Sequence, residues 1–350
     1  MSRKTVLFLY TEFSSYLECC INELLNSSTI DFHLVRYPVN KEAPFHFNNL
    51  NFSCYCRSEF NSKKELLNFT LKLNPDLLLV SGWIDKDYLY VASNVKTSLK
   101  IMAMDTQWRG SIKQRVFSKF TFNYFTKRFN YIWVPGERQK NFAKKLGFNS
   151  ENILTDFYSC DVNLFKNYYL KSIDSKRDDY PKVFLFFGRY IPNKCINELC
   201  EIFKEISFEQ DHDWQLWCVG KGNQWDNRIT HPKIKHLGFL QPSQLNELIS
   251  KCGVYVLPSK FEPWGVSLHE FVSAGFPIIA SDKVGSADKF LKNKLNGFLF
   301  NSASKNGLKE AMLRMMQMSS EEMLAMSKES LILSKKITPE IWGNKLKSLL

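Results

Sequence analysis

The sequence predicts an α/β protein made of two doubly wound parallel-sheet domains. Apolar runs of about four to six residues recur along the chain and do not alternate with polar residues, which is typical of strands buried on both faces. Helix-length segments separate the runs, and strand–helix alternation indicates parallel sheets covered by helices. The chain has 350 residues, more than the roughly 250–300 at which a single core stops growing. We therefore expect two domains.

The predicted elements follow from the apolar runs. In the first half the predicted strands are Val6–Tyr10, Phe32–Tyr37, Leu77–Val80, Ile101–Met104 and Tyr131–Val134. In the second half they are Val183–Phe187, Gln215–Val219, Ile234–Leu237, Val254–Leu257, Pro277–Ala280 and Phe298–Phe300. Predicted helices include Phe13–Leu25, Ser62–Leu73, Glu137–Leu146, Lys194–Ile206 and Gln244–Lys251. Ligands of such sheets bind beyond the carboxyl ends of the strands, so two facing sheets are expected to form a cleft.

The domain boundaries are predicted from composition. We assign residues 1–165 to the first domain, 166–181 to a linker and 182–336 to the second domain, because the segment before Pro181 is polar, charged and without a clear period. Residues 337–350 form a predicted helix that starts with Thr338-Pro339, an N-cap residue followed by proline. Its apolar face is expected to pack back on the first domain.

Cysteine usage and charge restrict the class of protein. The nine cysteines lack the paired C-x-x-C spacing of zinc sites, which favours a reduced, cytoplasmic chain without a structural metal. No apolar segment is long enough to span a membrane, and the apolar run near the N-terminus is interpreted as a strand and not as a signal peptide. With 47 basic and 35 acidic residues the net charge is +12, which favours an anionic partner.

The most informative segment is Leu257–Ala280, LPSKFEPWGVSLHEFVSAGFPIIA. A strand ends at Leu257 and a helix is predicted to start near Gly265, so amide groups at the helix start can bind a diphosphate. Gly265 permits close approach of a ligand. Glu262 and Glu270 are separated by seven residues, and each carboxylate can accept hydrogen bonds from vicinal sugar hydroxyls.

A second informative segment follows the first strand of the second half. It begins at Gly188-Arg189 and ends at Lys194. Arg189 can bind a phosphate in bidentate fashion, and Lys194 adds a positive charge at the start of the next helix. Two cations beside a phosphate group would stabilise negative charge that develops there.

These residues resemble the family-four retaining glycosyltransferases of the GT-B fold. The motifs that carry the resemblance are Gly188-Arg189…Lys194 and Glu262-Pro263-Trp264-Gly265…Glu270, with Ala274-Gly275-Phe276-Pro277 and Asn296-Gly297 after them. The resemblance is strong over about residues 183–300 and architectural over the first half. Gly285-Ser286 stands where the family usually has two glycines.

The resemblance implies a role for each matching residue. Arg189 and Lys194 would contact the donor diphosphate, Glu262 the donor sugar and Glu270 the ribose. The donor-binding set is then Gly188, Arg189, Lys194, Trp264, Gly265, Val266 and Glu270. The catalytic set is Asp105, Arg189, Lys194 and Glu262.

Asp105 is the candidate from the first domain. In the resembling enzymes a polar residue, often histidine, follows the fourth or fifth strand; here Asp105 follows Ile101–Met104. The family's glycine-rich loop after the first strand is replaced by Thr11-Glu12-Phe13-Ser14-Ser15. The alternative for Asp105 is a helix cap.

The predicted function is therefore retaining, metal-independent transfer of a hexose from a nucleoside diphosphate sugar to a glycan or lipid-linked acceptor. Bacterial surface polysaccharide or lipopolysaccharide synthesis is the expected setting, and no cofactor besides the donor is expected. One alternative is a nucleotide-sugar epimerase of the same architecture. Another is a basic nucleic-acid-binding protein, which no recognised nucleic-acid-binding motif supports. We therefore expect no nucleic-acid partner.

Residues 107–129 suggest a further partner. The segment from Thr106 to Gly136 has no acidic residue, six basic residues and nine aromatic ones, which suits the surface of an anionic membrane. The alternative is that its aromatic residues are core and its cations a solvated rim. We expect peripheral attachment to the inner face of the membrane.

Overall fold

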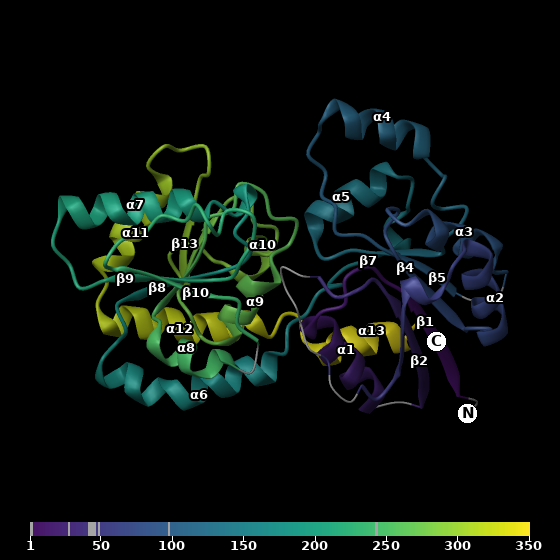
Figure 1. Ribbon diagram of the computed structural model, residues 1–350, viewed down its shortest axis with the longest axis horizontal. Helices are drawn as coiled ribbons and strands as arrows, with labels where there is room; N and C mark the ends of the chain where they lie inside the picture. The colour runs from purple at the N-terminus through teal and green to yellow at the C-terminus, as the bar shows by residue number, and fades with distance from the viewer. Residues whose placement is uncertain (1–2, 27–28, 41–46, 48–49, 97–98, 242–243) are drawn as a thin grey trace. The chain divides into compact units, whose positions relative to one another are not determined.

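A computed structural model describes residues 3–26, 29–40, 47, 50–96, 99–241 and 244–350 of the chain. The chain folds into two compact units. The first contains Met1–Asn40, Phe45–Ser159 and Pro339–Leu350, and the second contains Cys160–Thr338. Each unit has one parallel sheet with helices on both faces (Figure 1), which confirms the predicted fold class.

The first unit is built on a seven-stranded sheet in the order β3-β2-β1-β4-β5-β6-β7, and every strand pair in it is parallel. The strands are β1 (Lys4–Leu9), β2 (Ile30–Arg36), β3 (Ser53–Cys56), β4 (Leu77–Ser81), β5 (Leu99–Ala103), β6 (Tyr131–Trp133) and β7 (Ile153–Leu154). The direction of winding reverses between β1 and β4, the kind of point at which such sheets bind ligands.

Two apolar layers cover the faces of this sheet. Val6 and Phe8 pack toward α1 and α13, whereas Leu7 and Leu9 pack toward α2, α3 and α5, as expected for strands whose side chains alternate between two buried faces. The helices of the unit are α1 (Ser15–Asn26), α2 (Lys63–Leu73), α3 (Lys86–Asn94), α4 (Ile112–Thr121), α5 (Glu137–Lys145) and α13 (Pro339–Lys347), with short 3₁₀ helices at Arg57–Glu59 and Ser150–Asn152.

The end of the chain lies on the first unit. Helix α13 packs against α1, and the two run side by side in Figure 1. Trp342 is fully buried and stacks on Trp133 of β6, with ring centroids 5.1 Å apart and an interplanar angle of 21°. Through this apolar contact the last helix packs on the sheet formed by the first part of the chain.

The second unit is built on a six-stranded sheet in the order β10-β9-β8-β11-β12-β13, again parallel throughout. The strands are β8 (Val183–Phe187), β9 (Gln215–Val219), β10 (Ile234–Gly238), β11 (Val254–Leu257), β12 (Ile278–Ser281) and β13 (Gly297–Phe300). The winding reverses between β8 and β11, which are hydrogen-bonded neighbours.

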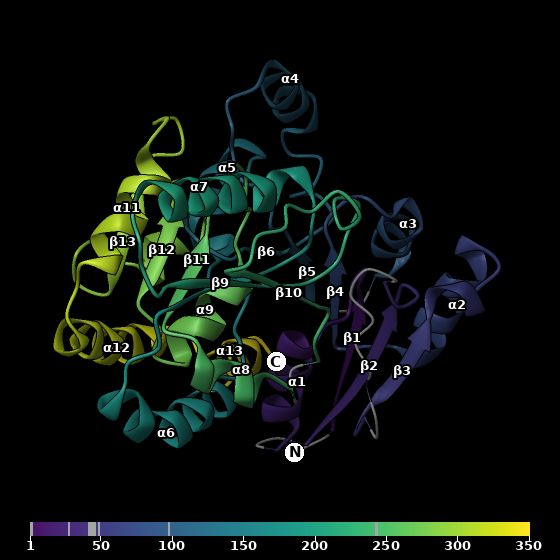
Figure 2. The same ribbon diagram turned by 60° about the vertical axis from the view of Figure 1, so that its left-hand side comes forward.

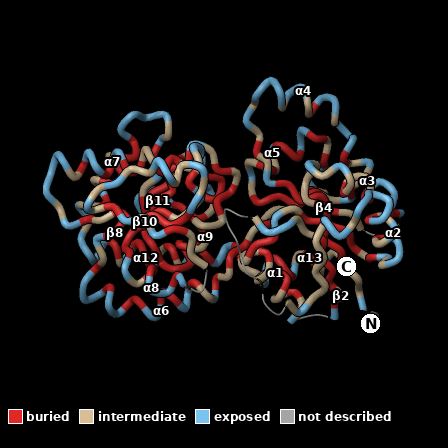
Figure 3. The backbone as a smooth tube through the Cα atoms, viewed as in Figure 1, coloured by how far each residue is buried: buried red, intermediate tan, exposed pale blue. Residues whose placement is uncertain are grey.

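Helices cover both faces of the second sheet. Helices α7 and α11 pack together on one face, and α6, α8, α9 and α12 pack together on the other, as Figure 2 shows. They span α6 (Val162–Asp178), α7 (Ile196–Glu209), α8 (Leu245–Lys251), α9 (Val266–Ser273), α10 (Ala287–Phe290), α11 (Gly307–Met316) and α12 (Ser320–Ser334), with a 3₁₀ helix at Pro192–Lys194. The central strands β8, β11 and β12 between these layers are almost entirely buried (Figure 3).

The predicted linker over residues 166–181 is wrong. Most of it belongs to α6, which packs on α8, α9 and α12 of the second unit. The buried positions of α6 recur with the helical period. Two of them, Ser172 and Lys176, are polar, so the sequence does not show a continuous apolar face for this helix. Lys176 is only 3% exposed, and its ammonium lies 4.3 Å from the centre of the Phe276 ring, a favourable cation–π contact.

Two edge strands were not predicted. β3 has only partly buried residues, and β7 has two residues, so neither produces a continuous apolar run. All the other strands lie within a few residues of their predicted positions. Among the described residues no helix combines the length and the apolar character needed to cross a membrane.

Candidate functional site

The two motifs of the second unit lie at the point where its sheet reverses direction. Gly188 and Arg189 directly follow β8, and the loop that carries Glu262 directly follows β11. Strands β8 and β11 are adjacent and parallel, with Tyr255 in register with Leu185. Their carboxyl ends therefore meet at one edge of the sheet, the position at which ligands of doubly wound sheets bind.

An ion pair joins the two motifs. The Nζ of Lys194 donates to Oε2 of Glu262, and the two side chains are only 15% and 11% exposed. The backbone supports this pairing, because the N–H of Lys260 donates to the carbonyl of Asn193 over 2.9 Å. The carboxylate of Glu262 also lies 3.5 Å from the hydroxyl of Ser259.

The backbone around Glu262 is held by the loop after β12. Glu262 forms an isolated parallel bridge with Val284, and the N–H of Gly285 donates to the carbonyl of Glu262 over 3.1 Å. A Cβ at Gly285 would lie 2.1 Å from the carbonyl oxygen of Pro263, so only glycine fits. Ser286, at the second position of the expected glycine pair, uses its hydroxyl to donate to the carbonyl of Gly265 over 2.9 Å.

Gly265 is the residue before α9, as the sequence predicts. Its φ of 90° lies in the left-handed region, which glycine adopts at no steric cost. A Cβ here would lie 2.9 Å from Cγ of Glu262. Val266 is the first residue of the helix and is partly exposed, whereas Trp264 is buried. Gly265, at the start of α9, therefore lies beside the side chain of Glu262.

Glu270 lies one helical turn and a half further along α9 and is partly exposed. Its carboxylate has no hydrogen-bond or ion-pair partner among the described residues. Surrounding protein displaces water from it and raises its pKa to about 7, because desolvation disfavours the charged form. The carboxylate is therefore available to a ligand with hydroxyl donors.

The Gly188 loop is close-packed against the loop after β9. A Cβ at Gly220 would lie 1.9 Å from the carbonyl oxygen of Gly188, and the N–H of Tyr190 donates to the carbonyl of Lys221 over 3.0 Å. The Lys194 side chain passes 3.9 Å from the position of a Cβ at Gly188. Arg189 is exposed. The second unit therefore carries the predicted residues Gly188, Arg189 and Lys194 in the segment after β8, and Glu262, Trp264, Gly265, Val266 and Glu270 on the loop and helix after β11.

Tyr255 and Ser267 lie next to the site and were not predicted from the sequence. The hydroxyl of Tyr255, in β11, donates to the hydroxyl of Ser267 in the first turn of α9 over 2.8 Å. It also lies 3.4 Å from the carbonyl of Phe187 at the end of β8. Tyr255 is fully buried, and burial holds the pKa of its hydroxyl well above the usual range. The signal in the sequence was a tyrosine with a polar hydroxyl inside an otherwise apolar strand.

Asp105 belongs to the other unit, two residues beyond β5. Its carboxylate is exposed and accepts a long hydrogen bond, 3.5 Å, from the hydroxyl of Tyr158. Its carbonyl accepts from Nε2 of Gln139 over 3.1 Å. Burial, together with the charge of Asp105, holds the pKa of Tyr10 and of Tyr158 well above the usual range. Tyr10 and Tyr158 thus lie near the Asp105 carboxylate at the carboxyl edge of the first sheet.

Two histidines of the second unit, His236 and His269, have structural roles. His269 is fully buried, accepts from the N–H of Cys160 at Nδ1 over 3.3 Å and contacts the carbonyl of Ser334 through Nε2 over 2.9 Å. Burial lowers its pKa to about 4, so it is neutral. His236 bridges Tyr190 and the carbonyl of Ile229. Both side chains are occupied by contacts that fix the fold.

Two Asp-x-Asp tripeptides, Asp85-Lys86-Asp87 and Asp211-His212-Asp213, resemble metal-binding motifs but also have structural roles. Asp85 caps α3 by accepting from the N–H groups of Asp87 and Tyr88, and Asp87 pairs with Arg57. Asp211 and Asp213 form ion pairs with lysines. Within the described part of the chain no group of three His, Cys, Asp or Glu residues is arranged to hold a metal ion.

The chain is similar in sequence and in fold to known proteins. Residues 171–330 match the model of the family described as glycosyl transferases group 1. The chain is similar to two uncharacterized glycosyltransferases of Methanocaldococcus jannaschii. It is 30% identical to MJ1607 over 39% of this chain and 36% of the relative, and 26% identical to MJ1178 over 58% and 54%. The matched segments thus span between about a third and a half of these curated relatives.

Two solved structures that resemble this one cover nearly the whole chain. A sucrose-phosphate synthase from Thermosynechococcus elongatus has a TM-score of 0.74 at 14% identity, covering 99% of this chain and 98% of the other. HepE from Anabaena, in complex with UDP and glucose, has a TM-score of 0.73 at 14% identity, covering 99% of both chains. At 14% sequence identity these matches show similarity of the fold alone. The chain has the GT-B fold, and its residues 171–330 match the model of the glycosyl transferases group 1 family.

Proposed function

We propose that the chain transfers a hexose from a nucleoside diphosphate sugar to a glycan or lipid-linked acceptor, with retention of the anomeric configuration. The observation that carries the proposal is the Lys194–Glu262 pair at the meeting point of β8 and β11. A cation suited to a diphosphate and a carboxylate suited to sugar hydroxyls lie side by side in this pair, which supports the proposal. HepE, a protein of the same fold, has been solved with UDP-glucose, which supports a nucleotide sugar as donor.

Donor binding would change the partners of the Lys194–Glu262 pair. Without a ligand, the two charges neutralise each other. A donor diphosphate would interact with Lys194, while hydroxyls of the donor sugar would donate to Glu262. Because both side chains are largely removed from solvent, these charge-assisted hydrogen bonds would be stronger than on an open surface. The pair therefore holds both groups in position before the donor arrives.

Glu270 suits the ribose of the donor. Its carboxylate is partly exposed on α9 and has no partner in the described part of the chain. A carboxylate can accept hydrogen bonds from two vicinal hydroxyls. The same interaction would favour the ionised form of Glu270 and lower its raised pKa. Ribose binding and ionisation of Glu270 are thus expected to strengthen each other.

The positive charge for the leaving group would come from the protein. Arg189 is exposed beside β8, Lys194 lies in the next turn, and the amide groups of Gly265 and Val266 lie at the start of α9. Preorganised charges and N–H groups of this kind stabilise developing negative charge. We therefore propose a mechanism that uses neither a metal ion nor any cofactor besides the donor.

The first unit would bind the acceptor, with Asp105 as its catalytic residue. Asp105 lies beyond the carboxyl end of β5, at the edge of the sheet where ligands of this fold class bind. The proposed setting is surface polysaccharide or lipopolysaccharide synthesis in the bacterial cytoplasm. The nine cysteines support a reducing compartment, since each is a free thiol.

A thermal-shift screen of nucleoside diphosphate sugars tests this proposal. A ligand at about 100 times its dissociation constant adds roughly 2.7 kcal/mol to the stability of the folded state, so the correct donor should raise the melting temperature clearly. The donor found in this way is then incubated with candidate acceptors, and the products are analysed. Interconversion of the donor sugar without transfer would instead support an epimerase, and stabilisation by none of the nucleotides would contradict the donor site.

A further inference from the structure

Helix α4 carries a row of exposed apolar side chains. Ile112, Val116 and Phe120 are 81%, 50% and 83% exposed. Their spacing of four residues places them on one side of the helix. Phe122, directly after the helix, is 57% exposed. Large apolar side chains gathered in this way on a surface mark an interaction site.

The opposite side of α4 holds the helix on the first unit. Ser118 is buried, and the ring of Phe117 packs on Trp83 with centroids 5.3 Å apart. The helix start is fixed by Ser111, whose hydroxyl accepts from the N–H of Gln114 over 3.3 Å. Because these contacts use the inner side, the apolar row points away from the unit. Figures 1 and 3 show α4 as an exposed helix at the margin of the first unit.

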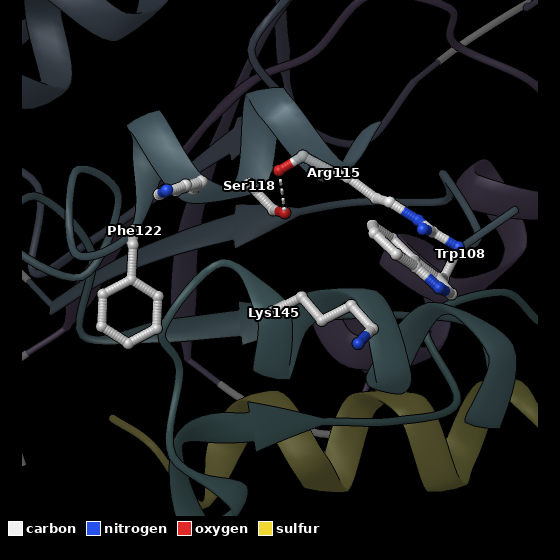
Figure 4. A pocket seen from close by; sticks show the side chains of 6 residues that line it. Trp108, Arg115, Ser118, Phe122 and Lys145 are labelled. Atoms are coloured by element: carbon white, nitrogen blue, oxygen red, sulfur yellow. Dashed lines mark hydrogen bonds between the residues drawn. The ribbon is translucent and has the colours of Figure 1, made fainter. Parts of the chain in front are cut away.

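Basic residues flank the apolar row. Lys113 lies on one side of it, and Arg115 and Lys119 lie on the other, all of them exposed. Arg115 and Lys119 also line a cavity of about 650 Å³ together with Trp108, Ser118, Phe122 and Lys145, shown in Figure 4. Residues 106–136 contain no acidic side chain. The surface is therefore apolar along its centre and positively charged along its margins.

We propose that this α4 surface, made of Ile112, Val116, Phe120 and Phe122 with Lys113, Arg115 and Lys119, binds the interface of an anionic lipid bilayer. The apolar row would enter the boundary between headgroups and acyl chains, and the basic residues would lie at the depth of the lipid phosphates. A soluble polyanion would match the charges but would leave the apolar row in water. The combination of the two features favours a membrane.

Vesicle co-sedimentation with the full chain tests the proposal. The vesicles contain phosphatidylcholine alone or with about 30% phosphatidylglycerol, at about 0.05 M and about 0.5 M salt. We expect binding to the anionic vesicles at low salt and little binding to the neutral ones. The charge variant Lys113→Glu, Arg115→Glu, Lys119→Glu should bind about a hundredfold more weakly, since each basic residue near the surface contributes about one kcal/mol.

A second variant separates a membrane from a polyanion. Ile112→Ser, Val116→Ser, Phe120→Ser keeps every charge and should still weaken vesicle binding by about tenfold or more. A matched control, Lys64→Glu, Lys72→Glu, Lys86→Glu, makes the same change of charge at exposed positions of α2 and α3 and should bind nearly as wild type does. Because all these side chains are exposed, circular dichroism melting curves should match that of wild type.

Three results would overturn the proposal. One is the absence of wild-type binding to anionic vesicles at low salt. Another is equal binding by the serine variant and wild type, with the charge variant impaired, which would identify a site for polyanions. The third is an equal loss of binding in the control variant, which would indicate an effect of net charge alone. The donor site lies in the other unit, so none of these results depends on it.

Discussion

Lys194 and Glu262, 68 positions apart in the sequence, form a largely buried ion pair that joins the loop after β8 to the loop after β11. The pair connects the stability of the second unit to its proposed chemistry. Removing one partner of such a pair leaves a charge that is neither solvated nor neutralised. The contribution of the pair to stability and its contribution to donor binding can be separated by measuring both properties on the same variants.

The first prediction concerns the stability contributed by this pair. Lys194→Met and Glu262→Gln should each lower the free energy of unfolding by about 3 kcal/mol. The double variant should lose clearly less than the sum of the two, because it leaves no unpaired charge. Urea unfolding of the four proteins measures this coupling. Additive losses would mean that the two side chains do not stabilise each other in solution.

The second prediction concerns Arg189, which is exposed and proposed to contact the leaving diphosphate. Arg189→Ala should lower turnover by about 10²–10³ and leave the melting temperature unchanged. Arg177→Ala is a matched control, since Arg177 is exposed on α6 of the same unit, and should change turnover less than about twofold. Retention of more than half the wild-type rate by Arg189→Ala would contradict the phosphate contact.

The third prediction concerns the pH dependence of Glu270, whose folded-state pKa is raised to about 7. A raised carboxylate pKa means that the folded protein holds the proton more tightly, so this group makes stability fall as the pH rises from about 4.5 to about 7. Affinity for a nucleoside diphosphate sugar should change in the opposite direction and increase as Glu270 ionises. Glu270→Gln should flatten both profiles.

Calorimetric titrations between about pH 5.5 and 8.5 measure the affinity profile. The intact nucleotide sugar serves as ligand because a terminal phosphate would itself titrate near pH 6. A pH dependence of affinity that is identical in wild type and Glu270→Gln would exclude Glu270 as its source.

The fourth prediction concerns metal ions. Because Arg189, Lys194 and the amides of α9 are proposed to supply the positive charge, transfer should continue in excess EDTA at nearly the untreated rate. The rate is measured before chelation, after chelation and after addition of Mg²⁺ or Mn²⁺. A rate lost on chelation and restored by either ion would reject the proposed mechanism.

The buried framework of the fold could be predicted because central strands are marked by their own residues. Runs such as Val183–Phe187 are apolar throughout, and parallel sheets bury such strands on both faces. The edge strands β3 and β7 lacked this signal. The sequence does not reveal helix α6, because its buried Lys176 is stabilised by the ring of Phe276, about a hundred residues later. A contact of that range is not visible in a local pattern.

The candidate site was predictable for a similar reason. Gly188 and Arg189 directly follow one predicted strand and Glu262 lies in the loop after another, and strand ends are where ligands of this fold class bind. The pairing of Lys194 with Glu262 depends on β8 and β11 being neighbours, which the sequence does not specify. For the basic, aromatic segment the sequence allowed either core or surface positions for the aromatic residues, and both occur. Phe125 and Phe129 are in the core, whereas Phe120 and Phe122 are exposed.

The central claim is that Glu270 binds the ribose of the donor and Glu262 its sugar, and calorimetric titration tests it most directly. Wild type, Glu262→Ala and Glu270→Ala are each titrated with the nucleoside diphosphate and with the nucleoside diphosphate sugar. Glu270→Ala should lose about 1.5–3 kcal/mol of affinity for both ligands. Glu262→Ala should bind the free diphosphate at least as tightly as wild type does, because Lys194 is no longer neutralised, and should lose affinity for the sugar-bearing donor. Equal losses in the two variants, or no binding of either ligand by wild type, would contradict the account.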